Sequence, residues 1–503
     1  MGIDPLTPVI VGAGQVLARE GDEAHLEPVA LIARALRQAG QDSGAGERLL
    51  ARADSVRCVP VVGWHYRNAA ALVAEDLGAS PRQTAQSAVF GGDGPQVLIN
   101  DAATRIAAGE LDVALIGGGE AVTVVRDARR AGRRPPWRSQ DESVPAALTL
   151  SEDRPPLTDA EAAVGLAPPV YMYALFESAL QAATGDSAEA HLQRIAGLWS
   201  RFSEVAARNP HAWLQRAYTP AEIATPGPGN RMIAAPYTKL LTANIQVNLA
   251  AGLILTSVRA AEQAGVPRDR WVFVHAGAEA HERWHVGERH GLASSPALQA
   301  AGRDAMERAG VSIDEIAHVD LYSCFPSAVE VAARELDLAI DEPGRPLTVT
   351  GGLTFAGGPG NNYASHSVAT LVGLLREDSQ AYGLATAVGW YLTKHAVGIY
   401  SARPPRGTFA TLTPQPTLPP PRTVVEGHTG PAAVEAYTVQ YDREGAPEAA
   451  IVSAITPDGQ RALIRSTDPA VTEMILAEPQ AGAAIELSNG DPLVSSVGAR
   501  RSS

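Results

Sequence analysis

The sequence predicts an α/β protein with two similar halves, followed by a small all-β domain. Three observations predict this architecture: short apolar runs alternate with segments of helical periodicity, the alternation occurs twice, and the composition changes after Arg403. Alternating strands and helices with short loops favour parallel-rich sheets that are covered by helices. Apolar residues form 45% and charged residues 19% of the 503 residues, which is typical of a folded globular protein.

The first half alternates between strand and helix patterns. Its expected strands are residues 8–14, 55–62, 87–90 and 112–117, and its expected helices are residues 27–40, 69–78 and 96–109. The last of these strands is nearly all apolar, as expected for a strand that is buried on both faces of a sheet. After an insertion, a strand at 245–257 and a helix at 258–265 complete this half.

The second half repeats the same order. Its expected strands are residues 271–276, 316–322, 347–350, 383–388 and 397–400, and its expected helices are residues 297–310, 326–336 and 367–375. Two units of this kind predict a duplicated α/β core.

The chain between the two halves has a different character. It is first rich in arginine and then helical and aromatic, and it is too long for a simple connection, so we expect an inserted subdomain. The predicted domains are 1–123 and 236–268 for the first half, 124–235 for the insertion, 269–405 for the second half, 406–422 for a linker and 423–503 for the β domain.

The linker and the β domain follow from turn and strand signals. Five prolines between residues 411 and 422 predict a stiff spacer. Short strands are then expected at residues 436–439, 449–455, 460–464 and 482–487, with a hairpin-type turn at 456–459. We expect a small barrel of the oligonucleotide/oligosaccharide-binding (OB) type.

Net charge and cysteine content exclude some classes of partner and some cellular locations. A formal net charge of −14 disfavours nucleic acid as the main partner, and the tail lacks the basic, aromatic-interleaved stripe of a single-strand binder. Cys58 and Cys324 are too few for a disulfide framework, so we expect a reducing, cytoplasmic location. No run of about 18 apolar residues is present, so we expect no membrane span.

Several segments resemble the thiolase superfamily, particularly its sterol-carrier-protein type and the thiolase-like relatives of that type. These segments are the VIVGAG strand at 9–14, AAGELDVALIGGGE at 107–120, DLYSCF at 320–325, and the GGL and GGPG turns within 351–360. The resemblance covers about residues 6–403. It implies a duplicated, five-layered αβαβα fold with an inserted loop domain, and acetyl-CoA acetyltransferase-like chemistry on CoA thioesters. The additional barrel resembles one found on some thiolase-like proteins.

The resemblance also locates the thiolase catalytic positions. It places Gly91 at the nucleophilic cysteine, Tyr322 at the histidine of His-Asp-Cys-Phe, Gly358 at the histidine of Gly-His-Pro, and Ala387 at the cysteine of Cys-x-Gly. Thiolase chemistry needs a thiolate at a helix start and an acid–base partner, and none of these four residues supplies one. We therefore expect a protein that binds CoA or acyl-CoA as a ligand, holds no permanent cofactor and has no thiolase turnover.

Two glycine-rich turns retain the frame of such a site. Gly91 and Gly92 precede one expected helix, and Gly358 and Asn361 precede another, so their backbone amides are expected to face an anion or a thioester carbonyl. The alternative interpretation is that the glycines only let two helices approach closely.

A second hypothesis is an acyl-CoA-processing enzyme with a different mechanism, such as an acyltransferase, a hydratase-like enzyme or a decarboxylase. Its candidate catalytic residues are His366, Tyr322, His395 and Cys324, each of which also has a purely structural interpretation. The histidines at 281, 285 and 290 match no metal motif, and we expect no metal site.

An arginine cluster between residues 126 and 138 is the expected contact for CoA phosphates. Arginine forks suit phosphate groups, and Arg134 and Arg138 are the candidates, with the segment 209–213 expected to line the same cleft. A solvated basic face is the alternative. A partner protein could bind through the C-terminal barrel.

Overall fold

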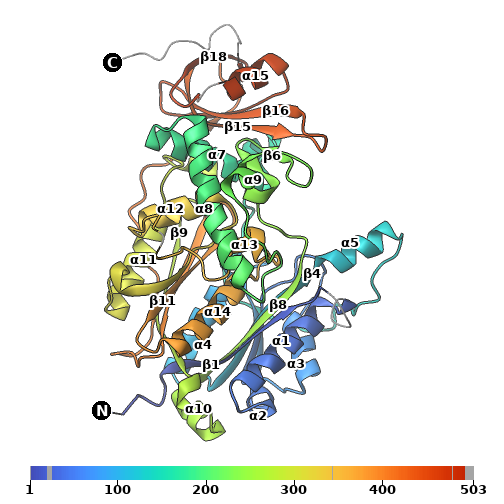
Figure 1. Ribbon diagram of the computed structural model, residues 1–503, viewed down its shortest axis with the longest axis vertical. Helices are drawn as coiled ribbons and strands as arrows, with labels where there is room; N and C mark the ends of the chain where they lie inside the picture. The colour runs from blue at the N-terminus through green and yellow to red at the C-terminus, as the bar shows by residue number, and fades with distance from the viewer. Residues whose placement is uncertain (1, 20–24, 343, 478–479, 493–503) are drawn as a thin grey trace.

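The computed structural model describes residues 2–19, 25–342, 344–477 and 480–492. The molecule is elongated, with the first residues of the chain at one end and the C-terminal domain at the other (Figure 1). No helix in these ranges is both long enough and apolar enough to cross a membrane. The last residues of the predicted β domain, 493–503, lie outside the described ranges.

One long sheet contains the strands of both halves. In spatial order its strands are β10 (Ile316–Asp320), β11 (Tyr382–Gly389), β12 (Lys394–Ser401), β9 (Val272–His281), β1 (Pro8–Leu17), β8 (Asn248–Ser257), β4 (Val113–Ala121), β2 (Ser55–Cys58), β3 (Gln83–Gln86) and β5 (Leu148–Thr149). The two halves meet where Val9 and Ile10 of β1 pair with β9. Strand β13 (Thr411–Leu412) pairs with β9 beside this junction.

Two central helices lie between the halves. Helices α4 (Gly94–Ala107) and α14 (Tyr363–Glu377) contact each other and strands of both halves. Their apolar side chains form one core with those strands, which makes the central layer of a five-layered αβαβα arrangement. The outer helices are α1 (Pro28–Asp42), α2 (Glu47–Ala51), α3 (Ala69–Leu77) and α10 (Val258–Ala264) in the first half, and α11 (Pro296–Ala309), α12 (Pro326–Glu335) and α13 (Gly352–Phe355) in the second.

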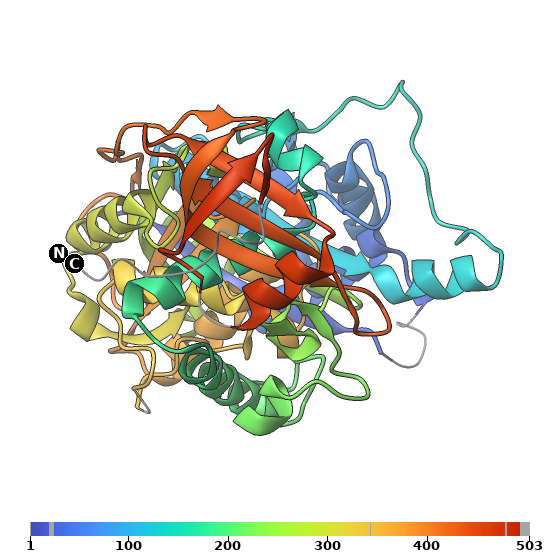
Figure 2. The ribbon, with the colours of Figure 1, turned by 90° about the horizontal axis from the view of Figure 1, so that it is seen from above.

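The insertion is a loop domain built mainly from helices. Its elements are α5 (Val122–Arg130), α6 (Asp159–Ala163), α7 (Pro169–Thr184), α8 (Ala188–Arg208), α9 (Pro220–Ala224), β6 (Met232–Ala234) and β7 (Tyr237–Thr238). Helix α5 and the chain that follows it extend away from the body of the molecule (Figures 1 and 2). Short 3-10 turns occur at Lys239–Leu241, Arg268–Arg270, Val286–Glu288 and Ile313–Glu315.

The C-terminal domain is a second, curled sheet that forms a half-barrel. Its strand order is β14 (Val424–Val425), β17 (Arg461–Ser466), β16 (Pro447–Ile455), β15 (Gly430–Tyr441), β18 (Ala484–Ser488) and β19 (Asp491–Pro492). Helix α15 (Pro469–Ala477) packs its Val471 and Ile475 into the core of this sheet. Strand β6 of the loop domain joins the same sheet, where Ala234 pairs with Gln440.

The C-terminal domain is fastened to the rest of the chain by Arg461. This side chain is 1% exposed and pairs with both carboxylate oxygens of Glu435 at 2.6 and 2.8 Å. It also donates hydrogen bonds to the backbone carbonyls of Val286, Gly287 and Arg289, at 3.3, 2.6 and 2.7 Å. A buried guanidinium that is paired and fully hydrogen-bonded holds two domains in one orientation.

Several elements differ from the sequence prediction. The third strand of the first half is Gln83–Gln86 rather than 87–90, because beyond it the amides of Ala88 and Val89 bind side chains, Ser151 Oγ at 2.8 Å and Asp153 Oδ2 at 3.2 Å. The expected strand at 347–350 is absent from the described chain. The amides of Val349 and Thr350 donate hydrogen bonds to the Asp320 carboxylate and not to a neighbouring strand.

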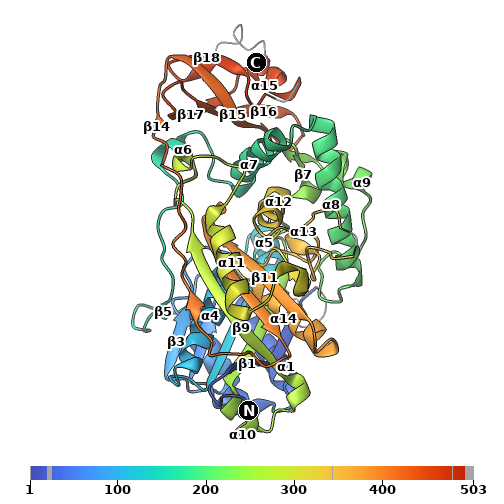
Figure 3. The same ribbon diagram turned by 90° about the vertical axis from the view of Figure 1, so that its left-hand side faces the viewer.

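The tail also differs from the prediction. The domain expected to be all-β contains helix α15, and its sheet is a curled half-barrel. The predicted linker is not a free spacer: it contributes β13 and then runs along the body of the molecule to β14 (Figure 3). On the way, the Arg283 guanidinium donates hydrogen bonds to the Pro419 carbonyl, at 2.6 and 3.2 Å.

Candidate functional site

In the turn before helix α4, neighbouring side chains occupy the space beside Gly91 and Gly92. Gly91 has φ +149°, and a Cβ there would lie 2.1 Å from Asp93 Oδ1 and 2.8 Å from Lys394 Nζ. A Cβ on Gly92 would lie 2.0 Å from the Tyr322 hydroxyl. Real Cβ contacts are never this short, so the space beside these two glycines is occupied by their neighbours.

A buried ion pair fills the space beside Gly91. Lys394 Nζ lies 3.3 Å from Asp93 Oδ1 and donates a hydrogen bond to the Phe90 carbonyl at 3.3 Å. The two side chains are only 1% and 4% exposed. Burial raises the pKa of the Asp93 carboxyl, and the Lys394 ammonium opposes this shift. Gly389 of β11 makes room from the other side, since a Cβ there would lie 2.2 Å from Asp93 Oδ1.

Tyr322 presents a hydroxyl group beside Gly92. Its ring packs edge-on against Tyr363, and its amide donates to Thr386 Oγ1 at 2.9 Å. Burial and the nearby Cys324 and Asp93 raise the pKa of the phenol well above its usual value, so it keeps its proton. Among the described residues this hydroxyl forms no hydrogen bond, which leaves a donor for the carbonyl of a ligand.

Backbone amides of both glycine turns donate hydrogen bonds to other groups of the protein. The Gly91 amide donates to Asn361 Oδ1 at 3.0 Å, and the Gly358 amide donates to the Asn244 carbonyl at 2.9 Å. The expectation that these two amides face a ligand carbonyl is therefore wrong. Gly358 differs from Gly91 in one respect: the nearest atom to a Cβ there would be 3.4 Å away, so this position has room for a side chain.

Two of the candidate residues are inert buried groups. Burial raises the pKa of the Cys324 thiol to about 12, so no thiolate is available at neutral pH. Ala387 lies in a small apolar cluster with Val97, Ala364 and Ala396, between the two central helices and the sheet. The structure thus brings Cys324 and Ala387 near the centre of the molecule without giving either a reactive group.

The two histidine candidates are buried and hydrogen-bonded. His366 Nδ1 pairs with Gln15 Oε1 at 2.8 Å, and His395 Nε2 lies 3.0 Å from Ser295 Oγ. Burial lowers the pKa of each histidine to about 3, which makes both of them weak bases. Because neighbouring strand residues point to opposite faces, His395 lies on the other side of β12 from Lys394 and outside the candidate site.

Glu120 and Asn361 connect the chain segments around the 357–361 turn, which we call the rim of the site. The amides of Val62 and Gly63 donate to the Glu120 carboxylate at 2.5 and 3.0 Å, and a Cβ on Gly360 would lie 2.5 Å from the same carboxylate. Burial raises the pKa of Glu120 to about 7. The Asn361 amide donates to the carbonyls of Pro60 and Val89, at 3.1 and 2.9 Å. These contacts bring three separate chain segments to the 357–361 turn.

A basic cleft of about 390 Å³ opens next to this rim. It is lined by Gly63, Trp64, His65, Val125, Arg129, Arg133, Arg134 and Pro135. The Arg134 guanidinium lies over the Trp64 ring, 4.7 Å from its centroid. None of the lining residues is a carboxylate, so the cleft is strongly positive in a chain whose net charge is −14.

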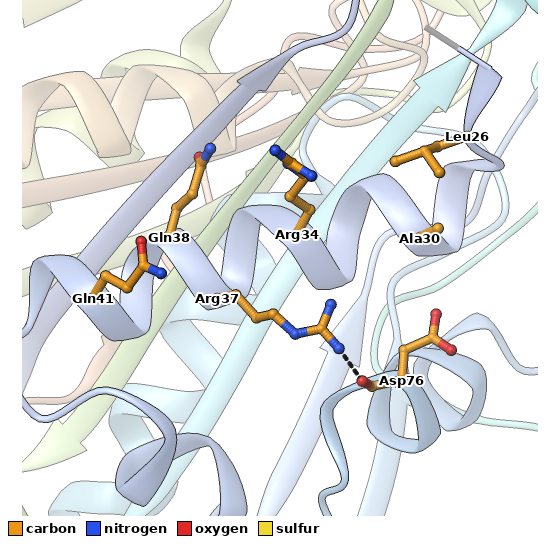
Figure 4. A pocket seen from close by; sticks show the side chains of 7 residues that line it. All are labelled: Leu26, Ala30, Arg34, Arg37, Gln38, Gln41 and Asp76. Carbon is orange, nitrogen blue, oxygen red and sulfur yellow. Dashed lines mark hydrogen bonds between the residues drawn. The ribbon is translucent and has the colours of Figure 1, made fainter. Parts of the chain in front are cut away.

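Helix α5 separates this cleft from a larger one of about 680 Å³. The larger cleft shares Arg133 and Arg134 but also contains Glu27 and Asp127. Arg19 lines it and stacks on Trp213, 5.2 Å from the ring centroid, so the expected segment 209–213 lies behind this cleft. A third groove, of about 580 Å³, lies on α1, adjoins the larger cleft at Leu26 and Ala30 and is lined by Arg34, Arg37, Gln38, Gln41 and Asp76 (Figure 4).

Arg138 is not available to a phosphate. Its guanidinium pairs with Glu27 Oε1 at 2.5 Å and with both oxygens of Asp76, at 2.7 and 2.8 Å. These carboxylates raise its pKa further and fix the end of the arginine segment to the body of the molecule. Of the two predicted phosphate ligands, only Arg134 lines a cleft.

One group among the described residues has metal-like donor spacing. Single donor atoms of Glu177, His191 and Glu330 lie within 4.8 Å of one another, all buried. Arg194 occupies the group, however: it pairs with Glu330 and donates to His191 Nδ1 at 2.7 Å. His191 Nε2 then carries the proton and lies 2.5 Å from Glu177 Oε1. A metal ion does not fit this donor set as it is arranged.

Sequence reasoning missed Asp93, Lys394 and Glu120; Arg133 lay within the predicted arginine cluster without being singled out. The sequence contained one signal for Lys394. It is one of only two lysines in the chain, and all other basic side chains apart from histidine are arginine. A single lysine at a buried position indicates that a compact ammonium is needed there. Nothing in the spacing of residues along the chain shows that Asp93 lies against it.

Comparison with known proteins identifies the family. Residues 412–491 match the family described as a thiolase-like protein type 1 additional C-terminal domain. The crystal structure of a monomeric SCP2-thiolase-like protein type 1 from Mycobacterium smegmatis aligns with a TM-score of 0.81 and 31% sequence identity, covering 98% of this chain and 99% of that chain. The chain belongs to the type 1 SCP2-thiolase-like proteins.

The wider likeness extends to an enzyme complex. A structure described as Ltp2-ChsH2(DUF35) aldolase aligns with a TM-score of 0.60 and 17% identity, covering 79% of this chain and 99% of that chain, which shows a shared fold only. None of the curated proteins matched the chain. The described C-terminal half-barrel is thus the additional domain that accompanies the thiolase fold in the type 1 SCP2-thiolase-like proteins.

Proposed function

We propose that this protein binds CoA or an acyl-CoA thioester and does not catalyse thiolase cleavage. The observation that carries the proposal is the basic cleft beside the glycine turns, with Arg129, Arg133 and Arg134 around Trp64. Three guanidinium groups and an aromatic ring match the phosphates and the adenine of CoA. Gly63 lines this cleft and donates to the Glu120 carboxylate, and the Tyr322 hydroxyl beside Gly92 is the proposed donor to the thioester carbonyl.

The absence of thiolase turnover rests on the filled space at Gly91. The Asp93–Lys394 pair occupies the volume that a cysteine side chain would need, and Cys324 keeps its proton. Neither a thiolate nor a basic histidine is then available for thiolysis.

Isothermal titration with CoA and acetyl-CoA tests the proposal, with thiol release from acetoacetyl-CoA measured in parallel. We expect micromolar binding and no thiol release. Arg133→Ala should weaken CoA binding about tenfold, since it removes a charge-assisted contact. Arg130→Ala is the matched control, because Arg130 belongs to the same arginine cluster (residues 126–138) and lines neither cleft. Equal effects of the two substitutions, or rapid thiolysis, would contradict the proposal.

A second candidate function is an acyl-CoA-processing enzyme that uses Tyr322 rather than His366. The unpaired phenol favours it, whereas the lowered pKa of His366 argues against a histidine base. Tyr322→Phe should then abolish any acyltransferase, hydratase-like or decarboxylating turnover while CoA still binds. Turnover that survives this substitution would exclude Tyr322 as the acid.

A partner protein and a cytoplasmic location belong to the same proposal. One face of the half-barrel is already used within the chain, where the Tyr437 amide donates to Ser178 Oγ of α7 at 2.8 Å. A partner would therefore bind on the outer side, near α15. The two cysteines are free and buried, which fits a reducing compartment.

A further inference from the structure

Exposed arginines gather on helix α5, on the chain that follows it and on helix α1. Arg129, Arg130, Arg133 and Arg134 come from the first two segments and Arg34 and Arg37 from α1, and we call these six the basic strip. The two clefts and the groove described above connect its members. The clefts share Arg133 and Arg134, and the larger cleft meets the groove of Arg34 and Arg37 at Leu26 and Ala30 (Figure 4).

The acidic side chains that line the two clefts and the groove already have cationic partners within the chain. Arg138 pairs with Glu27 and Asp76, and Arg126 pairs with Asp127. The arginines of the smaller cleft, by contrast, form no ion pair with any described residue. The basic strip therefore carries uncompensated positive charge in a chain whose net charge is −14, and it attracts anionic groups.

The basic strip extends beyond one small-molecule site. Small-molecule pockets have volumes of about 300–1,000 Å³. The clefts of about 390 and 680 Å³ and the groove of about 580 Å³ adjoin one another and together exceed that range. Arg130 lies outside all three with 75% of its side chain exposed, on a helix that projects from the body of the molecule (Figure 2). A CoA molecule in the smaller cleft would leave Arg130, Arg34 and Arg37 without an anion.

We propose that the basic strip docks a carrier protein with an acidic surface, whose phosphopantetheine arm presents the acyl thioester to the site. The inference rests on the proposed binding of CoA thioesters, because a phosphopantetheine arm has the phosphate, the pantetheine and the thioester of CoA with a protein in place of the nucleotide. Its phosphate meets Arg133 and Arg134, which line both clefts. Carboxylates on the surface of the carrier meet Arg130, Arg34 and Arg37.

A protein fits the basic strip better than a nucleic acid does. A nucleic-acid duplex carries its negative charge along its whole length, and beyond the strip it would meet the acidic surface of a chain with a net charge of −14. A folded carrier can confine its acidic side chains to the one face that contacts the strip.

Isothermal titration of the full-length protein tests the inference, with CoA and with an acyl carrier protein in its apo form and its phosphopantetheinylated holo form. We expect the holo form to bind about tenfold more tightly than CoA and more tightly than the apo form, because only it combines the arm with the acidic surface. Its affinity should fall between about 50 and 300 mM NaCl, since exposed charges are screened.

Charge reversals separate the carrier from CoA. Arg130→Glu and Arg37→Glu should each weaken holo-carrier binding about tenfold and change CoA binding little, because neither residue lines the smaller cleft. Arg133→Ala should weaken both. Arg443→Glu, at an exposed hairpin of the C-terminal domain, is the matched control and should leave both affinities unchanged. A thermal melt of each variant checks that it is folded.

Different outcomes distinguish this inference from the proposed function. Holo carrier that binds no more tightly than CoA, or that loses equal affinity in Arg130→Glu and Arg443→Glu, would overturn the inference and leave CoA binding intact. No binding of CoA or of either carrier form would overturn both. Tighter binding to a DNA duplex or to phosphatidylglycerol vesicles than to holo carrier would also overturn the inference, by assigning the basic strip to a different polyanion.

Discussion

Two glycines just before α4 show how neighbouring side chains can fill the place of a missing one. The atoms of Asp93, Lys394 and Tyr322 occupy the volume that side chains at Gly91 and Gly92 would need. Gly358, in the second turn, has an open neighbourhood by comparison. Within the second turn, Gly357 and Gly360 are also crowded, by Leu249 and Glu120, so Gly358 is the one turn position of the three with room for a side chain.

The buried Asp93–Lys394 pair should be important for stability. Lys394→Met leaves the Asp93 carboxyl buried without its cation, and we expect a loss of about 3 kcal/mol in the free energy of unfolding. Urea denaturation measures this loss. Lys239→Met, at the only other lysine, is exposed and should change stability little. In a double-mutant cycle with Asp93→Asn, the two losses should be less than additive. Similar losses for the two lysine variants would show that the pair contributes nothing.

Glu279 should give the protein a measurable pH dependence. This carboxyl is buried, accepts a hydrogen bond from Asn100 Nδ2 at 3.0 Å, and burial raises its pKa from 4.5 to about 7. The folded state therefore holds a proton on Glu279 that the unfolded state releases, so the contribution of Glu279 to stability should fall by about 3 kcal/mol as pH rises from 4.5 to 7 and change little above that range.

Glu279→Gln keeps the neutral form and should remove the Glu279 contribution of about 3 kcal/mol, which is read as the difference between the wild-type and variant profiles; Glu120, whose pKa burial also raises to about 7, keeps its own contribution. Urea denaturation at several pH values between 4.5 and 8 is the measurement, with Glu444→Gln, at an exposed turn, as the control. If the pH profiles of wild type and Glu279→Gln have the same slope in this range, Glu279 does not titrate as described.

At the residue scale, the sequence located the two glycine turns but not the side chains that pack against them. Gly91 and Gly358 could be located because their turns have a recognisable pattern. Asp93 and Lys394 could not be linked, because their contact depends on how α4 packs against β12. The inert state of Cys324 and His366 depends on burial, which a sequence pattern does not measure.

At the element scale, strands and helices were predictable wherever packing agrees with local pattern. Most strands and helices of the two halves were expected within a few residues of their observed bounds. The exceptions are the segments 87–90 and 347–350, whose amides bind side chains instead of a neighbouring strand. Helix α15 was missed because a nine-residue apolar segment does not distinguish a short helix from a strand.

The strongest test at this scale is the attachment of the C-terminal domain by Arg461. Arg461→Met removes its bonds to Glu435 and to three backbone carbonyls, and we expect a loss of about 3–5 kcal/mol. Calorimetry should show the C-terminal domain melting before the core, with faster proteolysis of the proline-rich segment. Arg443→Met, at an exposed hairpin, is the control. An unchanged single transition would mean that other contacts hold the domain.

At the scale of the whole molecule, the sheet edge at β3 is covered by the chain itself. Strand β5 pairs in parallel with β3 at Ala85 and Gln86, and the Leu150 amide extends this pairing to the Gln86 carbonyl at 2.9 Å. An uncovered edge strand invites pairing with a second copy, and covering it removes that opportunity.

We therefore expect this protein to be a monomer of 52.5 kDa in solution. The relative from Mycobacterium smegmatis is also described as monomeric. Size-exclusion chromatography with light scattering, over a hundredfold range of concentration, measures the mass. A stable species of twice this mass would show that another surface mediates self-association.

The pairing of β6 with β15 has a consequence for the order of events on the ribosome. β6 and α7 are synthesised long before β15, which supplies their partner strand and the Tyr437 amide that meets Ser178. At about 5–20 residues per second, this gap lasts on the order of tens of seconds. During that time the nascent chain exposes the unpaired edge of β6 and one apolar face of α7. Chaperones can bind these surfaces, and proteases or aggregation can act on them, until β15 is synthesised and covers them.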